Sequence, residues 1–261
     1  NTAQYGGAIN NNNGNLTITN TTLQYNNATD YGGAIYNNEG GTITITNHTT
    51  LNNNTAEWGG AINNNNGNLT ITNTTLNNNN ATWGGAIYNN YGGTITITNH
   101  TTLQHNTATS YGGAIENLFG TITITNHTTL NNNTATRGGA IDNWVGNTII
   151  YNSTLQYNNA TQGGAIYYET NPSYDTVVVL YNSTFTENKA TNGAVIQNED
   201  GYGKYNITLN KFQQNKATNN KETLNLGPNI IDGSIIEDNT YENTDISTEN
   251  SLTIPDENTK Y

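Results

Sequence analysis

The chain has 261 residues, of which roughly a fifth are Asn, and its seven basic and 19 acidic side chains give a net charge of −12. So few cations argue against nucleic-acid binding and against docking on an anionic membrane surface. The absence of cysteine excludes a disulfide framework and a thiolate metal site. Three Phe and no Met are few for a globular core of this length. There is no long apolar run, so we expect no membrane insertion by this chain.

Two short signatures repeat about every 25 to 29 residues. The first is GGAI, which begins at Gly6, Gly32, Gly59, Gly84, Gly112, Gly138 and Gly163 and decays at Asn192. The second is Leu or Phe, then Asn three residues later, then Ala two further on, beginning at Leu23, Leu51, Leu76, Leu103, Leu130, Leu155, Phe185 and Phe212. Regularly placed apolar residues in every copy distinguish the chain from a disordered polar sequence and favour a solenoid.

Each copy divides into three short strands separated by turn residues. In one copy these are residues 32–37, 42–46 and 50–54. The Thr-Ile-Thr-Ile-Thr segment alternates with period two, which places Ile43 and Ile45 on one face. Stacking the copies would pair their backbones and enclose files of Ile, Leu and Ala. The sequence therefore predicts an all-β chain folded as a right-handed parallel β-helix, with about eight rungs of three strands over residues 1–217.

The Asn of the second signature is predicted to be structural. Its side-chain amide can donate to one neighbouring rung and accept from the other, as stacked Asn ladders do. The predicted ladder contains Asn26, Asn54, Asn79, Asn106, Asn133, Asn158, Asn188 and Asn215. The first Gly of GGAI is expected at a corner, with either a positive φ or a close backbone approach.

Both ends of the chain depart from the repeat. Residues 218–241 are expected to form a C-terminal cap or a degenerate rung, and residues 242–261 an acidic tail or linker. We also expect the whole C-terminal region, residues 218–261, to cover Ile149, Tyr151, Val179 and Tyr181, where outward Thr gives way to apolar residues. At the other end, Asn1 falls inside a repeat, which predicts either an upstream continuation or head-to-tail self-association.

The repeats resemble those of a known class of surface protein. Stretches such as GGAIYNN, GGTITITN and TTLNNNTA resemble the repeats of adhesin-like surface proteins of methanogenic archaea over residues 1–217. GGAI paired with Phe/Leu-x-x-Asn is also similar to the repeats of chlamydial polymorphic outer-membrane proteins. The resemblance implies pectin-lyase-like β-helical repeats, an extracellular or cell-surface location, and attachment to other cells or to surface glycans. It does not extend beyond Thr218.

A file of aromatic residues precedes successive GG pairs. We call Tyr5, Tyr31, Trp58, Trp83 and Tyr111 the aromatic strip. Arg137 follows in the same file and is expected to contact Tyr111 by a cation–π interaction. The strip either stabilises a corner between rungs or forms a platform for sugar rings or a partner's apolar surface, and the two roles are compatible.

A second candidate patch contains Glu116, Phe119, Asp142 and Trp144, with Glu169 expected in the longer turn that follows. Glu116 and Asp142 follow Ile in adjacent rungs, and such a pair can bind Ca²⁺ or serve a glycosidase. The favoured interpretation is that both acids are solvated turn residues. Counted along an extended strand, Arg137 lies roughly 16 Å from Asp142, which argues against a catalytic partnership.

One turn of the repeat carries both a glycosylation sequon and a histidine. Asn47, Asn99 and Asn126 are candidate N-glycosylation sites, each followed by His48, His100 or His127. Two imidazoles in successive rungs without a third ligand form a weak metal site, so we predict no metal. Outward Thr-x-Thr pairs also resemble the face of β-helical ice-binding proteins, at Thr17/Thr19, Thr44/Thr46, Thr70/Thr72, Thr96/Thr98 and Thr123/Thr125.

Together these patterns predict a non-enzymatic extracellular rod that attaches to a cell-surface glycan or protein, without a cofactor. The alternatives are a subunit of a head-to-tail filament, a polysaccharide lyase or glycoside hydrolase of β-helix type, and an ice-binding protein.

Overall fold

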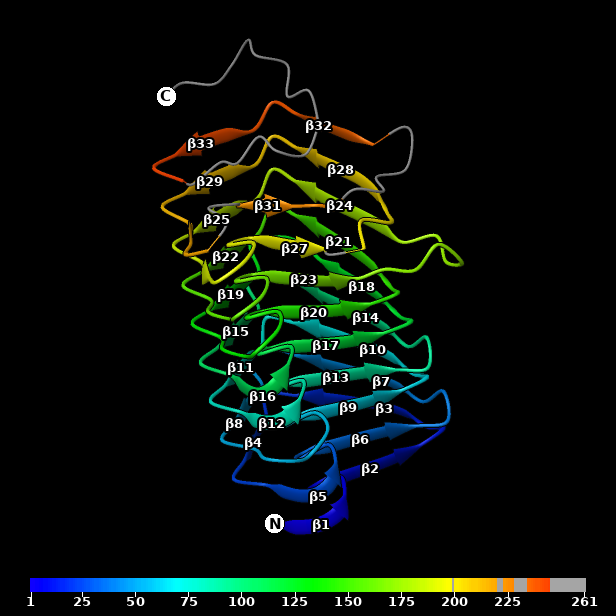
Figure 1. Ribbon diagram of the computed structural model, residues 1–261. Coiled ribbons are helices and arrows are strands. Elements are labelled where there is room, and N and C mark those ends of the chain that lie inside the picture. Colours follow the sequence, from blue (N-terminus) through cyan, green and yellow to red (C-terminus); the bar gives the residue numbers. More distant parts are fainter. Residues whose placement is uncertain (199, 220–222, 228–233, 245–261) are drawn as a thin grey trace.

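The chain folds into a column of stacked turns, each built from three short strands (Figure 1). The computed structural model describes residues 1–198, 200–219, 223–227 and 234–244. Within these residues there is no helix, and three parallel sheets of nine strands each run the length of the column. The predicted parallel β-helix is thus confirmed, with one turn more than the eight copies of the second signature.

We name the three sheets by their sequence. The GGAI sheet contains β2 (Ile9–Asn12), β6 (Ile35–Asn38), β9 (Ile62–Asn65), β13 (Ile87–Asn90), β17 (Ile115–Leu118), β20 (Ile141–Trp144), β23 (Ile166–Glu169), β27 (Ile196–Asn198) and β31 (Leu224–Asn225). The Thr-Ile sheet contains β3 (Asn15–Thr19), β7 (Thr42–Thr46), β10 (Asn68–Thr72), β14 (Thr94–Thr98), β18 (Thr121–Ile124), β21 (Asn147–Tyr151), β24 (Val177–Tyr181), β28 (Lys204–Thr208) and β32 (Ile235–Glu237). The Leu sheet contains β4 (Thr22–Gln24), β8 (Thr50–Asn52), β11 (Thr75–Asn77), β15 (Thr102–Gln104), β19 (Thr129–Asn131), β22 (Thr154–Gln156), β25 (Thr184–Thr186), β29 (Lys211–Gln213) and β33 (Thr240–Glu242).

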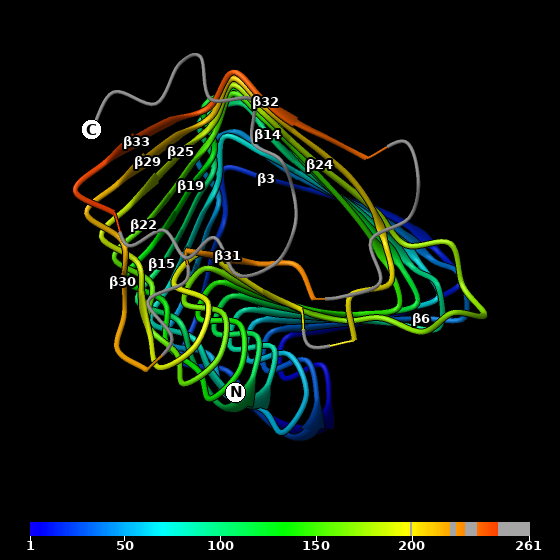
Figure 2. The same ribbon diagram turned by 45° about the horizontal axis from the view of Figure 1, so that its top comes forward.

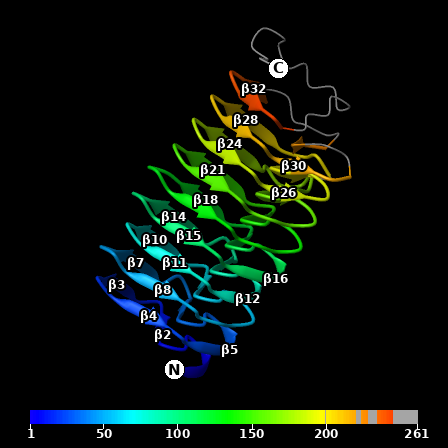
Figure 3. The same ribbon diagram turned by 90° about the vertical axis from the view of Figure 1, so that its left-hand side faces the viewer.

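The register of the stacked strands is set by their apolar side chains. In the Thr-Ile sheet, Ile45 lies over Ile71 and Ile71 over Ile97, and all three are fully buried. A slip of one residue would turn each Ile outward, at a cost of about 1.5 to 3 kcal/mol per side chain. The other two sheets have equivalent files of buried apolar side chains, which include Leu51 in the Leu sheet and Ile35 in the GGAI sheet. Figure 3 shows the resulting straight stack of turns.

The predicted Asn ladder is present and its amides are fully bonded. For example, Asn106 Nδ2 donates to Leu76 O at 3.1 Å and to Asn133 Oδ1 at 3.0 Å, and Asn106 Oδ1 accepts from the backbone N and Nδ2 of Asn79. A second ladder was not predicted. It lies two residues after the Ile of GGAI, and each of its Nδ2 atoms donates to the next Asn and to a Gly carbonyl of its own turn, at Asn11, Asn37, Asn64, Asn89 and Asn117.

The GG pair forms a tight corner at which the chain reverses toward the GGAI sheet. Gly138 has φ +60°, and a Cβ added there would lie 2.1 Å from Ile141 O. A Cβ on Gly139 would lie 2.1 Å from Gly164 O in the next turn. Both alternatives expected for this Gly, a positive φ and a close backbone approach, therefore occur together. The corner brings the segment before GG beside the GGAI sheet, as a column of loops in the view along the axis (Figure 2).

The C-terminal strands β31, β32 and β33 continue all three sheets through Glu242, where a degenerate rung was expected. Tyr241 stacks on Phe212 at a centroid distance of 5.1 Å, and Thr244 Oγ1 accepts from Asn215 N in place of a ladder Asn. Within the described residues Tyr151 and Tyr181 remain 36% and 39% exposed, so the expected cover is not found there. Most of the predicted tail, residues 245–261, lies outside the described residues.

Candidate functional site

A groove runs along the column between the aromatic strip and the outward side chains of the GGAI sheet. The strip is held by backbone pairing from turn to turn, through β1 (Thr2–Tyr5) with β5 (Asn27–Tyr31), β12 (Asn80–Trp83) with β16 (Thr107–Tyr111), and isolated bridges that continue through Arg137. In the later turns the same pairing occurs between β26 (Lys189–Ala190) and β30 (Lys216–Ala217). The strip therefore forms one wall of the groove and outward side chains of the GGAI sheet form its floor, in two hollows along the column.

The rings of the aromatic strip pack on one another in successive turns. Tyr5 and Tyr31 stack at a centroid distance of 5.5 Å, Tyr31 and Trp58 lie 5.0 Å apart, and Trp58 and Trp83 stack at 5.2 Å with an interplanar angle of 10°. Trp83 and Tyr111 are register partners. Except for the exposed Tyr5, the rings are half-buried. Such contacts contribute about 0.5–1.5 kcal/mol per pair, and this stacking supports the structural role considered above.

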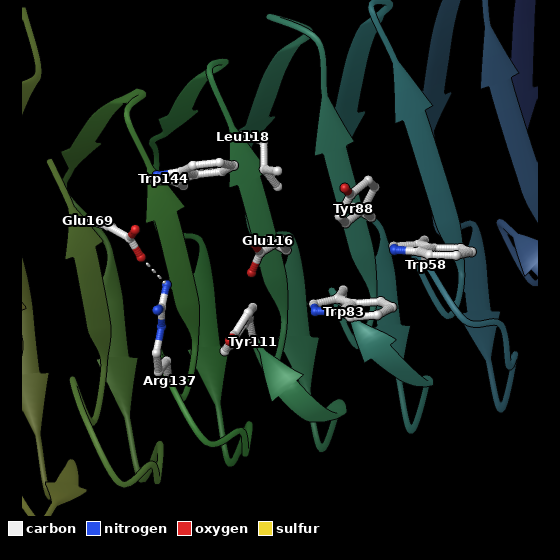
Figure 4. Close-up of a pocket in the computed structure, with 9 residues that line it drawn as sticks. All are labelled: Trp58, Trp83, Tyr88, Tyr111, Glu116, Leu118, Arg137, Trp144 and Glu169. Carbon is white, nitrogen blue, oxygen red and sulfur yellow. Dashed lines mark ion pairs between the residues drawn. The ribbon is translucent and has the colours of Figure 1, made fainter. Parts of the chain in front are cut away.

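The groove opens into two hollows, and all five strip residues line one or the other. The first has a volume of about 560 Å³ and is lined by Tyr5, Asn10, Asn12, Tyr31, Tyr36 and Asn38. The second, which we call the central cavity, has a volume of about 330 Å³. It is lined by Trp58, Trp83, Tyr88, Tyr111, Glu116, Leu118, Arg137, Trp144 and Glu169 (Figure 4). All three tryptophans of the chain line the central cavity.

Arg137 lies across the floor of the groove and contacts Asp142, contrary to the expected separation of roughly 16 Å. Arg137 Nε donates to Asp142 Oδ2 at 3.2 Å, and a terminal guanidinium nitrogen lies 2.9 Å from Glu169 Oε2. The guanidinium carbon lies 4.2 Å from the ring centroids of both Tyr111 and Tyr167, so the predicted cation–π contact is confirmed. The expected distance was wrong because the GG corner folds the strip back over the sheet.

The two acids of the second patch are buried, so the expectation of solvated turn residues was wrong. Glu116 is 4% exposed and Asp142 is fully buried, and they are register partners in successive turns. Burial raises the pKa of Asp142 to about 6 even though Arg137 opposes the shift. Burial, followed by Asp142 and Glu169, raises the pKa of Glu116 well above its ordinary value. Asp142 Oδ1 and Glu116 Oε2 are buried and have no hydrogen-bond partner among the described residues.

The four residues of the second patch take three different positions. Glu116 and Trp144 line the central cavity, whereas Asp142 is not among its lining residues. Phe119 lies on the outer turn with φ +59°, where its ring is 5.2 Å from Trp144 and 5.8 Å from Tyr174. The patch and the aromatic strip therefore meet in one cavity, which the sequence did not predict.

Two residues of the central cavity, Tyr88 and Leu118, were missed from the sequence, and Glu169 was expected in a turn, although a signal for all three was available. Tyr88, Leu118 and Glu169 occupy positions one or three residues after the Ile of GGAI, where period-two alternation turns side chains outward. Comparing the first residue after this Ile from turn to turn, and likewise the third, would have identified the side chains of the groove floor. Glu169 belongs to β23 rather than to the longer turn that follows.

The glycosylation candidates Asn47, Asn99 and Asn126 are exposed in turns with φ of 52–53°. His100 and His127 stack beside them at a centroid distance of 5.3 Å. Within the described residues there is no group of three or more His, Cys, Asp or Glu that could hold a metal ion, so the Ca²⁺ expectation at Glu116 and Asp142 gains no third ligand. The outward Thr-x-Thr pairs lie in register across β3, β7, β10, β14 and β18.

Comparison with models of protein families, with curated proteins and with solved structures finds no match for this chain. Among the described residues, no helix is long and apolar enough to span a membrane.

Proposed function

We propose that this protein is an extracellular attachment rod that binds glycan chains along the groove between the aromatic strip and the GGAI sheet. The observation that carries the proposal is that all five strip residues line hollows of one groove. Partly exposed aromatic rings offer apolar contact to the C–H faces of sugar rings, and the surrounding Asn, Tyr and Glu side chains offer hydrogen bonds to hydroxyls.

The dimensions of the groove favour an elongated ligand. The floor residues of the central cavity extend from Tyr88 on β13 to Glu169 on β23, which is three steps of about 4.8 Å. The first hollow continues the same wall through Tyr5 and Tyr31. A chain of several sugar rings lying along the axis would contact both hollows.

The test is calorimetric titration of the purified chain with a panel of oligosaccharides. Trp83→Gln places at the strip the residue that Gln162 already provides in a later turn. It should weaken binding roughly tenfold, the loss of about 1.4 kcal/mol of aromatic contact, and lower the melting temperature slightly because the stacking on Trp58 is lost. Trp83→Tyr should retain binding, because Tyr31 and Tyr111 occupy the same file. Tyr181→Thr, on the Thr-Ile sheet, is the matched control.

If Trp83→Gln bound every oligosaccharide as tightly as the wild-type chain does, the aromatic strip would have only a structural role. Failure of the wild-type chain to bind any oligosaccharide would remove the proposal itself.

A glycan-cleaving enzyme is the second candidate, and the buried carboxyl pair favours it. Two neighbouring carboxyl groups with raised pKa can act as general acid and base at a glycosidic bond. Release of reducing ends from a polysaccharide, abolished in Glu116→Gln, would support this function. Arg137 covers Asp142 and holds it by a hydrogen bond, so attachment remains the function that the geometry supports better.

A further inference from the structure

The groove already contains one cation, supplied by the chain itself. The Arg137 guanidinium lies between the rings of Tyr111 and Tyr167 and pairs with Asp142 and Glu169. This position therefore combines what organic cations require, namely aromatic faces and carboxylates, of which that of Asp142 is fully buried.

One turn earlier, the same framework lacks the cation. Tyr111 occupies the position of Arg137, and Glu116 occupies the position of Asp142. Five residues separate the members of each pair. Glu116 lines the central cavity together with the rings of Trp83, Tyr88 and Tyr111 (Figure 4). Among the ion pairs of the described residues, none includes Glu116, and its Oε2 is buried without a partner.

The charges facing the cavity leave this position short of one positive group. Glu116 and Glu169 line the cavity with a single cation, Arg137, which is already paired with Glu169 and with the buried Asp142. An unpaired carboxylate in a buried site is costly, so the site gains most from a ligand that brings a positive charge.

We propose that the central cavity is a binding site for an ammonium group carried on a sugar ring, as in a glycan of unacetylated amino sugars. The ammonium group donates hydrogen bonds to the Glu116 carboxylate and lies against the rings of Trp83 and Tyr88, while the sugar ring occupies the open part of the cavity. The inference rests on the proposed glycan binding and names its substrate class. An amino sugar fits better than an isolated amine because the cavity extends over several turns of the groove.

Ligand binding should also depend on pH. The groups facing Glu116 are Tyr88 on β13, Tyr111 on β16, Asp142 on β20, Glu169 on β23 and Arg137. Burial and the neighbouring acids favour the neutral carboxyl and raise its pKa, whereas a bound cation favours the carboxylate. Binding therefore releases a proton, and affinity for an ammonium ligand should rise with pH through the raised pKa of the Glu116 carboxyl, as long as the sugar ammonium group stays charged.

The experiment compares glucosamine oligomers with N-acetylglucosamine oligomers of the same length by titration calorimetry. Because Trp58, Trp83 and Trp144 all line the cavity, quenching of tryptophan fluorescence gives a second readout. The wild-type chain should bind the glucosamine oligomer at least tenfold more tightly at pH 6. Glu116→Gln should reduce this preference to less than about threefold and remove most of its pH dependence. Glu57→Gln removes the same charge beside the strip but outside the cavity lining, and should retain the preference.

Equal binding of the two oligomers would overturn the inference and leave the proposed glycan binding intact. Binding of neither oligomer, or of any other oligosaccharide, would overturn both. Tighter binding of a Lys-rich peptide than of the glucosamine oligomer would overturn the assignment of an amino sugar.

Discussion

The interior and the groove of this solenoid use the same backbone in opposite ways. Inside, each turn repeats the last, so that Ile lies over Ile and Asn over Asn for most of the column. On the groove floor the residue after Ile changes at every step, from Tyr88 to Glu116 to Asp142 to Tyr167. Identical residues in successive turns therefore stabilise the stack. Different residues at the same register position give the groove floor its charged and aromatic side chains.

The largest expected effect comes from breaking the interior repetition at the Asn ladder. Asn106→Ala removes both donors and both acceptor contacts of a fully bonded amide. It leaves Leu76 O and Asn79 N buried without their partners, at about 1–3 kcal/mol for each group. We expect the free energy of unfolding to fall by roughly 3–5 kcal/mol, measured by denaturant titration.

The matched control for the ladder is Asn80→Thr, on the strip segment. Asn80 is exposed, and Thr55 and Thr107 occupy the same file in the adjacent turns. Asn80→Thr should change the free energy of unfolding by no more than about 0.5 kcal/mol. A similar loss in both variants would show that the ladder is no more important than any other Asn of the chain.

The second expected effect is a pH dependence of the unfolding free energy, which comes from a buried acid beside the groove. The pKa of Asp142 is raised by burial from 3.8 to about 6, so the folded chain binds more protons than the unfolded chain between these values. This contribution to stability is complete below about pH 4 and is lost as the pH rises through 6, at about 3 kcal/mol. Asp142→Asn should flatten the decline in unfolding free energy between pH 4 and pH 7.

Asp30→Asn is the control for the pH experiment, because Asp30 is a partly exposed acid that accepts a hydrogen bond from Gln4. It should reproduce the wild-type profile. A wild-type stability that rises from pH 4 to pH 7 would contradict the direction of the shift at Asp142.

The same contrast explains what could be predicted from the sequence. Period-two alternation placed Ile43 and Ile45 inside, because side-chain direction in a strand depends only on local geometry. The positions of Glu116 and Asp142 depend instead on the corners at Gly112 and Gly138, and the positive φ of Gly138 folds Arg137 onto the sheet. A distance counted along an extended strand does not include that reversal of the chain. The burial of both acids and the central cavity therefore required the structure.

A third experiment places a cationic side chain of the protein itself beside Glu116. Tyr111→Arg places a guanidinium five residues before Glu116, which copies the spacing of Arg137 and Asp142. The new side chain should pair with Glu116, lower the pKa of its carboxyl and weaken binding of a glucosamine oligomer roughly tenfold. Tyr111→Gln removes the ring without adding charge, and serves as the control in the same titration. Equal loss in both variants would attribute the effect to the missing ring.

The smallest expected effect concerns the file that precedes Ala in the second signature. Early turns carry Asn or Thr there, whereas the later turns place the exposed Lys189 directly beside Lys216 in the parallel register. Like charges opposite one another in a sheet are destabilising by a few tenths of a kcal/mol, and salt screens them. Lys189→Thr restores the early residue and should raise the unfolding free energy by that amount at low ionic strength. The gain should vanish in about 1 M NaCl, where the screening length falls to about 3 Å. A gain that persists in salt would instead reflect the strand preference of Thr, and would show that the two lysines do not repel measurably.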